Sequence, residues 1–184
     1  YLHDERIDTL FWFSLLLFMG AMLGVVLGGD LVVLLVFWEL TSVSSFLLIG
    51  INYWDPEARR GALNALFVTA AGGLCLLAGF LIVALEAGTF SLPVLLEQGI
   101  PVTTLSTVAM VLILLGAFTK SAHFPFHFWL PQAMAAPTPI SAYLHSATMV
   151  KAGIYLIIRF YPVFGSFAWW NPIIMVMGLA TFLV

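Results

Sequence analysis

Three ionisable side chains stand inside apolar runs that could lie in a membrane. Glu39 lies in LLVFWELTSVSSF, Lys120 ends LILLGAFTK, and Lys151 lies in HSATMVKAGIYLI, six residues after His145. Ionisable groups inside membranes usually mark paths for ions or protons. Hydrocarbon disfavours the charged form of an amine and a nearby carboxylate favours it, so a lysine under both influences can exchange a proton near neutral pH. These four residues therefore predict a proton relay at mid-membrane depth.

Simpler interpretations of two of these residues stay open. Lys120 could sit at a helix end with its amine reaching toward the membrane surface, although apolar residues on both sides argue against this. Glu39 could serve the structure alone. Ser42 and Ser45 follow it at roughly helical spacing and form a polar stripe. Lys120 is the natural partner for Glu39, because both are predicted at similar depth.

Two further histidines, His123 and His127, stand four residues apart, as in some metal sites. Pro125 between them weakens that geometry, and no carboxylate or cysteine is close enough in sequence to complete a site. No metal site is predicted, and these histidines are expected either to line a hydrated entry path or to be packed and hydrogen-bonded. The sequence shows no phosphate-binding loop, nucleophile triad or set of redox-centre cysteines, so no cofactor and no enzymatic chemistry are expected.

The composition indicates a membrane protein. Of the 184 residues, 62% are hydrophobic and 8% are charged, which excludes a soluble domain and a disordered chain. A net charge of −3 implies no nucleic-acid partner, and Cys75 as the single cysteine excludes an intrachain disulfide. The chain starts at Tyr1 without a signal peptide and stops inside an apolar run. Both ends look cut, so we expect an internal piece of a larger polytopic protein.

A helix needs about 20 apolar residues to cross a bilayer core of about 30 Å. Because lipid offers no hydrogen-bond partner to the backbone, the apolar segments are expected to be helices. Small residues at every third or fourth position predict close-packing seams at Gly20, Gly24 and Gly28, and again at Ala71, Cys75 and Ala78. The predicted spans are Leu10–Gly29, Leu31–Ile51, Gly61–Leu85, an interrupted stretch Val102–Met134, Pro139–Tyr161, and a start from about Trp169.

The fourth of these stretches is too long for one straight span. Residues 102 to 134 would form a helix of about 50 Å. Pro125 cannot donate a hydrogen bond to the Ser121 carbonyl, and its ring crowds that carbonyl. We therefore expect the helix to break between Lys120 and Pro125, with the carbonyls of the first half aimed at a cation, as in transport proteins with broken helices.

Local signals place helix ends and the sides of the membrane. Asp55 and Thr138, each followed by proline, predict helix N-caps. The segment before Val102 is weakly amphipathic and lacks Lys and Arg, which predicts an interfacial loop that can hold a short helix. Arg6, Arg59 and Arg60 fall on one side of the membrane, which is therefore expected to be cytoplasmic, with residues 1–9 as its lead-in. Arg159 falls on the other side and is predicted to be an interfacial anchor.

Long motifs carry a family resemblance. The segments VFWELTSVSSFLLIG, LLGAFTKSAHFPFHFWLPQAMAAPTPISAYLHSATMVKAGIYLI and GGLC resemble the large A subunit of Mrp-type multisubunit Na+/H+ antiporters. The wider family includes the antiporter-like subunits of respiratory complex I and of membrane-bound hydrogenases. Complex I relatives tend to read WEGVG and HAATMVTAG where this chain reads WELTS and HSATMVKAG, and both departures favour the Mrp-type family.

The resemblance implies an all-α bundle of transmembrane helices with two inverted five-helix repeats. Residues 10–161 would form the first repeat, and 162–184 a loop and the truncated start of the next helix. The family's functional glutamate and lysine match Glu39 and Lys120, and the histidine and lysine of its following helix match His145 and Lys151. Lys120 would carry the proton, Glu39 would stabilise its charged form, and His145 and Lys151 would pass protons toward the second repeat.

The implied protein is part of a secondary antiporter and is not an enzyme. It would exchange protons for a monovalent cation such as Na+, beside other membrane subunits in the plasma membrane of a prokaryotic cell. One alternative is a proton-pumping subunit of complex I or of a membrane-bound hydrogenase. Another is a scaffold that keeps the fold without transport, although the retained charges argue against it. The sequence leaves open which cation is exchanged.

Overall fold

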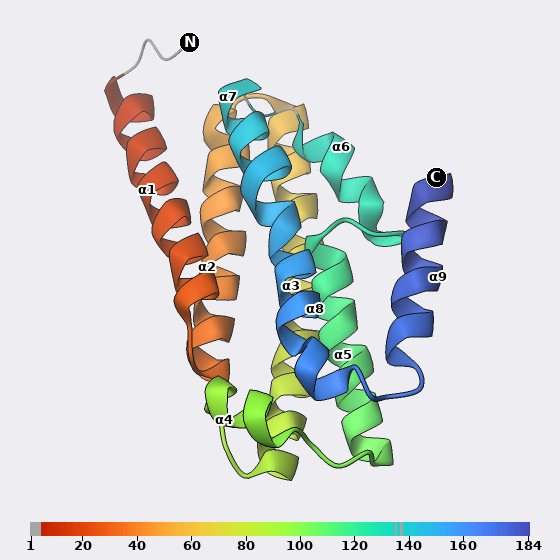
Figure 1. The fold of residues 1–184 in the computed structure, drawn as a ribbon. Helices are drawn as coiled ribbons and strands as arrows, with labels where there is room; N and C mark the ends of the chain where they lie inside the picture. The colour runs from red at the N-terminus through yellow and green to blue at the C-terminus, as the bar shows by residue number, and fades with distance from the viewer. Residues whose placement is uncertain (1–4, 135, 137) are drawn as a thin grey trace.

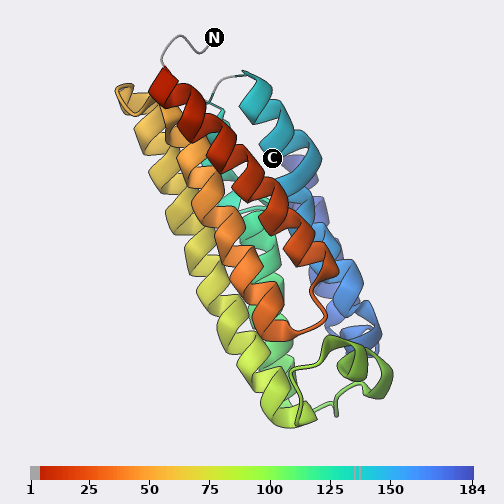
Figure 2. The ribbon, with the colours of Figure 1, turned by 90° about the vertical axis from the view of Figure 1, so that its left-hand side faces the viewer.

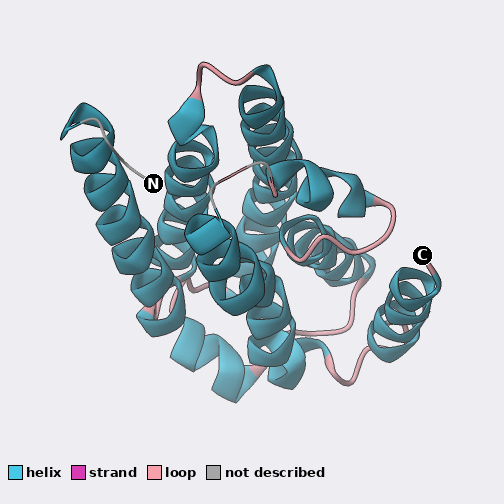
Figure 3. Ribbon diagram, turned by 90° about the horizontal axis from the view of Figure 1, so that it is seen from above, coloured by secondary structure: helices cyan, strands magenta, loops and turns pink. Residues whose placement is uncertain are grey.

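The computed structural model describes residues 5–134, 136 and 138–184, and this part of the chain is helical without a strand. The helices lie side by side in a bundle, with α1 and α9 at opposite edges (Figures 1 and 3). In chain order they are α1 (Glu5–Leu27), α2 (Leu31–Ile49), η1 (Gly50–Asn52), α3 (Pro56–Ala87), α4 (Leu92–Gln98), α5 (Thr104–Lys120), η2 (Phe126–Phe128), α6 (Trp129–Ala133), α7 (Thr138–Ser141), η3 (Ala142–Thr148), α8 (Met149–Phe164) and α9 (Trp170–Leu183).

The bundle confirms the expected polytopic membrane architecture. Among the described residues, four segments are long and apolar enough to cross a membrane: 9–27, 31–52, 56–87 and 142–164. The helices α5 and α9 are shorter apolar helices. The helix α1 begins before the predicted Leu10, and α3 begins before the predicted Gly61, because polar first turns extend both helices beyond their apolar runs. The loop predicted before Val102 contains a short helix, α4.

Side-chain caps define where the long helices begin. The Asp55 carboxylate accepts a hydrogen bond from the Glu57 amide at 2.9 Å, with Pro56 in the first turn, as predicted. Asp30 caps α2 in the same way, through the amides of the second and third helical residues. Thr138 is not an N-cap, because it is already the first residue of α7. The rule that places a cap before proline therefore located this helix one residue late.

The close-packing seam of α3 differs from the predicted one. A Cβ atom at Gly72 would lie 1.8 Å from Thr119 Oγ1, and one at Gly79 would lie 2.7 Å from Ile113, so α3 and α5 touch through these glycines. The predicted Ala71, Cys75 and Ala78 are neighbours of this seam and are not fully buried. The prediction was displaced by one residue, because the sequence pattern does not say which of two adjacent small stripes meets α5.

The seam predicted on α1 is confirmed only in part. At Gly24 a Cβ atom would collide with the Phe37 ring of α2 at 2.2 Å, so this glycine permits the close α1–α2 approach seen in Figure 2. A Cβ atom at Gly28 would lie 2.9 Å from the Gly24 carbonyl oxygen and 3.5 Å from the Leu34 amide nitrogen of α2. At Gly20 nothing lies within 4 Å, so this residue makes no interhelical contact within the described chain.

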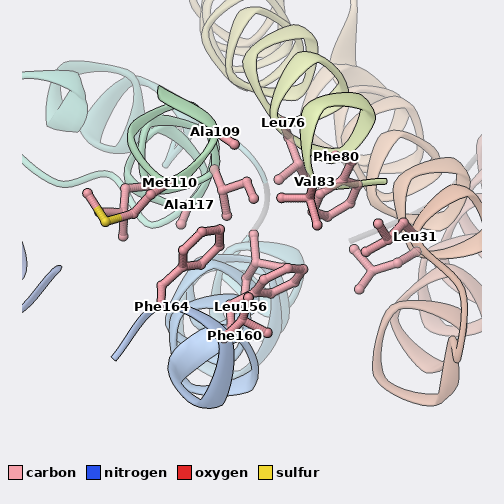
Figure 4. Packing of buried hydrophobic residues seen from close by; sticks show 14 of the residues in the cluster. Leu31, Leu76, Phe80, Val83, Ala109, Met110, Ala117, Leu156, Phe160 and Phe164 are labelled. Carbon is pink, nitrogen blue, oxygen red and sulfur yellow. The ribbon is translucent and has the colours of Figure 1, made fainter. Parts of the chain in front are cut away.

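The interior is filled by interlocking apolar side chains. Figure 4 shows Leu76, Phe80 and Val83 of α3 facing side chains of α5 and α8, and Phe80 stacks on Phe160 with ring centroids 5.5 Å apart. Many large apolar side chains remain on the outside of the bundle, which suits a lipid environment. Since lipid tails are themselves apolar, close packing and buried polar contacts hold such helices together.

Two of the predicted membrane spans are not single α-helices, and one of these interruptions was predicted. The helix α5 ends at Lys120, and an irregular segment through Pro125 leads to the 3-10 turn η2 and the short helix α6. This confirms the predicted break. The fifth predicted span, by contrast, is not one α-helix, because η3 is a π-helix between α7 and α8. It also runs past Tyr161 to Phe164, with Pro162 in its last turn.

Candidate functional site

The amine of Lys120 is buried at the break of the fourth span. The residue is 0% exposed, and Nζ donates hydrogen bonds to the Trp38 carbonyl at 3.0 Å and to Ser42 Oγ at 2.6 Å. The same Nζ lies 5.2 Å from the centroid of the Trp38 ring, within the range of a cation–π contact. All three contacts come from α2. Lys120 therefore does not reach toward the membrane surface, and its nearest polar partners are neutral groups.

The carboxylate of Glu39 lies close to this amine without forming an ion pair. The two charges interact electrostatically, but no nitrogen–oxygen contact within 4.0 Å joins them among the hydrogen bonds and ion pairs of the described residues. Glu39 Oε1 is buried and has no hydrogen-bond partner. It packs against Gly73 of α3 so closely that a Cβ atom there would lie 1.6 Å from Oε1. Glu39 and Lys120 are thus brought together, as predicted, but held slightly apart.

The carbonyls at the end of α5 do not serve the Lys120 amine. The Ala117 carbonyl accepts from the Ser121 amide at 3.0 Å, and the Phe118 carbonyl accepts from the His123 amide at 3.0 Å. The Thr119 carbonyl accepts from Trp129 Nε1 at 3.0 Å. The expectation that the break would aim its own carbonyls at the cation was therefore wrong. The irregular segment and Trp129 of α6 supply the donors to these carbonyls, and α2 supplies the acceptors for the amine.

His145 lies in the π-helix η3, next to α6. It is 7% exposed, and its ring lies 6.0 Å from the Trp129 ring, measured between centroids. Neither ring nitrogen makes a hydrogen bond, although the Ser141 carbonyl is near. Since Trp129 also binds the carbonyl of Thr119, one indole connects the histidine to the end of α5. Short π-helical segments often occur at functional sites.

Lys151 lies away from this group. Its side chain is exposed on α8, in a groove of about 200 Å³ between α1 and α8 that is also lined by Met22, Thr148 and Tyr155. The buried side of α8 packs on α5, and Ser121, the residue after α5, donates its hydroxyl to the Val150 carbonyl at 2.6 Å. The structure therefore brings Glu39, Lys120 and His145 into one region and leaves Lys151 on a different face of α8.

The two histidines of the break do not form a metal centre in the described chain, where no group of three His, Cys, Asp or Glu side chains comes together. His123 packs on Phe118 with ring centroids 5.2 Å apart, and His127 packs on Phe124 at 5.9 Å. In both rings Nδ1 is buried without a partner. The ring contacts agree with the expectation that these histidines are packed. Their Nδ1 atoms, however, are not hydrogen-bonded, although that expectation included hydrogen bonds.

Arg159 does more than the predicted interfacial anchor. Its guanidinium donates to the Val26 carbonyl at 3.0 Å and to the Gly28 carbonyl at 2.9 Å, and it also contacts Tyr155. Tyr155 donates its hydroxyl to the same Val26 carbonyl at 2.8 Å. A cation at the C-terminal end of α1 is favoured by the helix dipole. Arg159 therefore joins α8 to the last turn of α1.

Sequence reasoning missed several residues that shape the site. Trp38 contributes a backbone carbonyl, which carries no sequence signal. Gly73 stands out in the sequence only as part of a motif, and Trp129 only as part of an apolar run. Ser42 belongs to the polar stripe next to Glu39, but its bond to Lys120 was not foreseen. The helical spacing of Ser42 and Ser45 after Glu39 was the one sequence signal that pointed toward the contact between Ser42 and Lys120.

A helical membrane bundle in which a lysine is buried at a helix break, near a carboxylate of another helix, has the features of an ion- or proton-transporting membrane domain. The chain belongs to the family described as "NADH:quinone oxidoreductase/Mrp antiporter, TM", which matches residues 28–184. It is a multi-pass membrane protein of this family.

Similar proteins include subunits of cation/proton antiporters. The chain is 57% identical over 173 residues to the A subunit of the Na+/H+ antiporter of Bacillus subtilis (strain 168), covering 93% of this chain and 22% of that protein. It is 51% identical over 186 residues to the A/B subunit of a probable K+/H+ antiporter of Rhizobium meliloti (strain 1021), covering 100% and 19%. The chain thus spans about a fifth of the length of these curated relatives.

Solved structures show the same fold. The chain superposes on a chain of the Mrp complex from Dietzia sp. DQ12-45-1b with a TM-score of 0.84 and 43% identity, covering 92% of this chain and 19% of that one. It superposes on a chain of a membrane-bound sulfane sulfur reductase, an archaeal respiratory membrane complex, with a TM-score of 0.81 and 26% identity, covering 91% and 34%. Both superpositions agree with the family assignment.

Proposed function

We propose that this chain forms a proton-translocating part of a multisubunit monovalent cation/proton antiporter. Lys120 carries the proton at mid-membrane, Glu39 stabilises its charged form, and His145 and Lys151 pass protons onward. Residues 10–161 form the first five-helix repeat, and 162–184 lead into the next helix. The other membrane subunits of the complex are the partners. The observation that carries the proposal is the fully buried Lys120 amine, which has a carboxylate at electrostatic range.

The contacts of Lys120 suit an amine that changes its charge. A permanently charged buried amine would be expected to form a direct ion pair, because burial without a partner is very unfavourable for an ion. Here the amine has two neutral acceptors, and the carboxylate stays nearby without touching it. Such surroundings tolerate both protonation states. His145, with two unbonded buried nitrogens, offers a next group that can hold a proton.

The test is Lys120→Ala in the full-length antiporter complex, with cation/proton exchange measured in everted membrane vesicles. The expected result is loss of exchange to background, with a normal amount of assembled complex. Arg60→Ala removes an exposed cation from the first turns of α3 and serves as the matched control, with exchange unchanged. Normal exchange in an assembled Lys120→Ala complex would remove the proposed role.

Na+ and K+ are the first cations to test, because the similar proteins carry both names. Exchange in vesicles should therefore be assayed with each ion separately. Both names describe antiport against protons, so the proton path proposed for this chain is common to both cases.

A second candidate is a proton-pumping subunit of a respiratory or hydrogenase complex. It is favoured by the family description and by the superposition on a respiratory membrane complex. Purification of the native complex separates the two candidates. Subunits with redox centres should accompany the chain in a respiratory complex, and none should accompany it in an antiporter.

A further inference from the structure

The four hydroxyl side chains of α2 are all buried, but one of them is used differently from the other three. Thr41 donates to the Trp38 carbonyl at 2.7 Å, Ser44 to the Leu40 carbonyl at 2.6 Å, and Ser45 to the Ser42 carbonyl at 2.9 Å. These hydroxyls are bound to carbonyls of their own helix, as hydroxyl residues in helices commonly are. Only Ser42 has a close partner on another helix, which is the Lys120 amine at 2.6 Å.

The hydrogen of the Ser42 hydroxyl is not firmly bound. Its one intrahelical acceptor is the Trp38 carbonyl at 3.5 Å, which is at the outer limit of a hydrogen bond. That carbonyl already accepts from Thr41 and from Lys120. The Ser42 hydroxyl can therefore turn at little cost, whereas turning the other three hydroxyls would break a good bond.

A hydroxyl can both donate and accept a hydrogen bond, whereas a carbonyl oxygen only accepts. Ser42 can accept a hydrogen bond from the charged ammonium, and by rotating it can donate one to the lone pair of the neutral amine. The Trp38 carbonyl can accept from either form but cannot bond the lone pair. Of the groups in contact with Nζ, only Ser42 can therefore follow a change of protonation.

We propose that Ser42 is the resting partner of Lys120 in both protonation states and thereby sets the pH at which Lys120 exchanges its proton. The inference rests on the proposed function, because it assumes that Lys120 carries the proton. Ser42 contacts the proton-carrying amine directly, and its influence adds to that of Glu39. The hydrogen bond to the ammonium is charge-assisted and therefore stronger than the bond to the neutral amine.

Other titratable groups around Lys120 are few within the described chain. Glu39 faces it from α2, His123 follows it in the break, and His145 lies behind Trp129. The buried faces of α3 and α8 bring no titratable side chain. Lys151 lies on the exposed side of α8. A shift of the pH profile after substitution of Ser42 can therefore be assigned to few groups, and Glu39 is the main one to control for.

The experiment compares Ser42→Ala and Ser42→Thr in the full-length complex, measuring exchange in everted vesicles over a range of about pH 6 to pH 10, which brackets the titration of a buried lysine. Loss of the hydroxyl should move the alkaline limb of the profile by about one pH unit toward lower pH, because the ammonium loses a charge-assisted bond. Thr keeps the hydroxyl and should keep the wild-type profile. Ser45→Ala, which removes a buried hydroxyl bound to its own helix, should also leave the profile unchanged.

A wild-type profile for Ser42→Ala, or an equal shift for Ser45→Ala, would overturn the inference. Should Ser42→Ala fail to assemble, the isosteric pair Ser42→Thr and Ser42→Val gives the same comparison, with the shift expected only for Val. Lys120→Ala in the same assay separates the proposed function of Lys120 from the role inferred for Ser42. An active Lys120→Ala complex refutes the proposed function, whereas an inactive one beside an unshifted Ser42→Ala refutes only the role of Ser42.

Discussion

Adding one methyl group at Gly73 should disable transport while leaving the chain folded. The Cβ atom of Gly73→Ala would lie 1.6 Å from Oε1, 2.7 Å from Cδ and 3.3 Å from Oε2 of Glu39. Ordinary contact begins at 3.4 Å, so Oε1 must retreat by about 1.8 Å, the difference between 3.4 and 1.6. The colliding atoms belong to the far end of a flexible side chain, and the carboxylate can move without a shift of the backbone.

The expected loss is therefore functional. A displacement of about 1 Å at a reacting group can lower a rate by about 100-fold, so exchange in everted vesicles should fall by roughly 10- to 100-fold. The amount of this chain in the purified complex should stay near that of the wild type, since alanine also favours the helix over glycine by about 1 kcal/mol. The assay is exchange per assembled complex.

Two other glycines provide matched controls. Nothing lies within 4 Å of a Cβ atom at Gly20, so Gly20→Ala should change neither assembly nor exchange. At Gly72 the new atom would lie 1.8 Å from Oγ1 and 2.8 Å from Cβ of Thr119, which is too close to the backbone for the side chain to move aside. Gly72→Ala should accordingly reduce the amount of assembled complex. The three Gly→Ala substitutions add the same methyl group and differ only in the atoms that this group would contact.

Full exchange in an assembled Gly73→Ala complex would refute the reasoning, and so would a loss that only follows reduced assembly. A compensating variant sharpens the test. Glu39→Asp withdraws the carboxylate by one methylene, about 1.5 Å, which is close to the space that the new methyl group needs. The double variant with Gly73→Ala should therefore lose less than the two single losses combined.

Two further predictions concern charges. Glu39→Gln should impair exchange while Glu39→Asp keeps part of it, because only a carboxylate stabilises the charged form of Lys120; equal exchange in both variants and the wild type would make Glu39 a structural residue. Arg159→Ala should remove two donors from the carbonyls that end α1 and destabilise the fold by about 2 kcal/mol. This would appear as a lower midpoint of thermal unfolding of the purified complex, with Arg159→Lys intermediate, and an unchanged midpoint would contradict the assigned contact.

Much of the fold could be predicted from the sequence, because the membrane restricts the backbone to helices of a set length. The break after Lys120 followed from Pro125, which has no amide hydrogen, and from a stretch too long for one span. The π-helix around His145 could not be predicted in this way. A π-helical segment depends on the packing of its neighbours, and no residue in it lacks a donor as proline does.

The candidate site was predicted in its residues but not in its geometry. The depths of Glu39 and Lys120 follow from counting along the spans, so their proximity could be expected. The direction of Lys151 was not predicted, although Lys151, Tyr155 and Arg159 recur at every fourth position and give α8 one polar face, opposite its buried apolar residues. The glycine seam of α3 was predicted one residue away from its true position, because the sequence does not say which of two adjacent small stripes meets α5.

Two consecutive glycines of α3 leave the space that is taken by Glu39 and by the end of α5 next to Lys120. Gly73 leaves room for the Glu39 carboxylate, and Gly72 leaves room for Thr119, the residue before Lys120. Because both contacts come from one turn of one helix, α3 sets how closely the carboxylate and the end of α5 can approach it. On α2, Glu39 and Ser42 are three residues apart, about 4.5 Å along the axis. Ser42, which accepts from the Lys120 amine, and Glu39, which interacts with it electrostatically, therefore lie within one turn of α2.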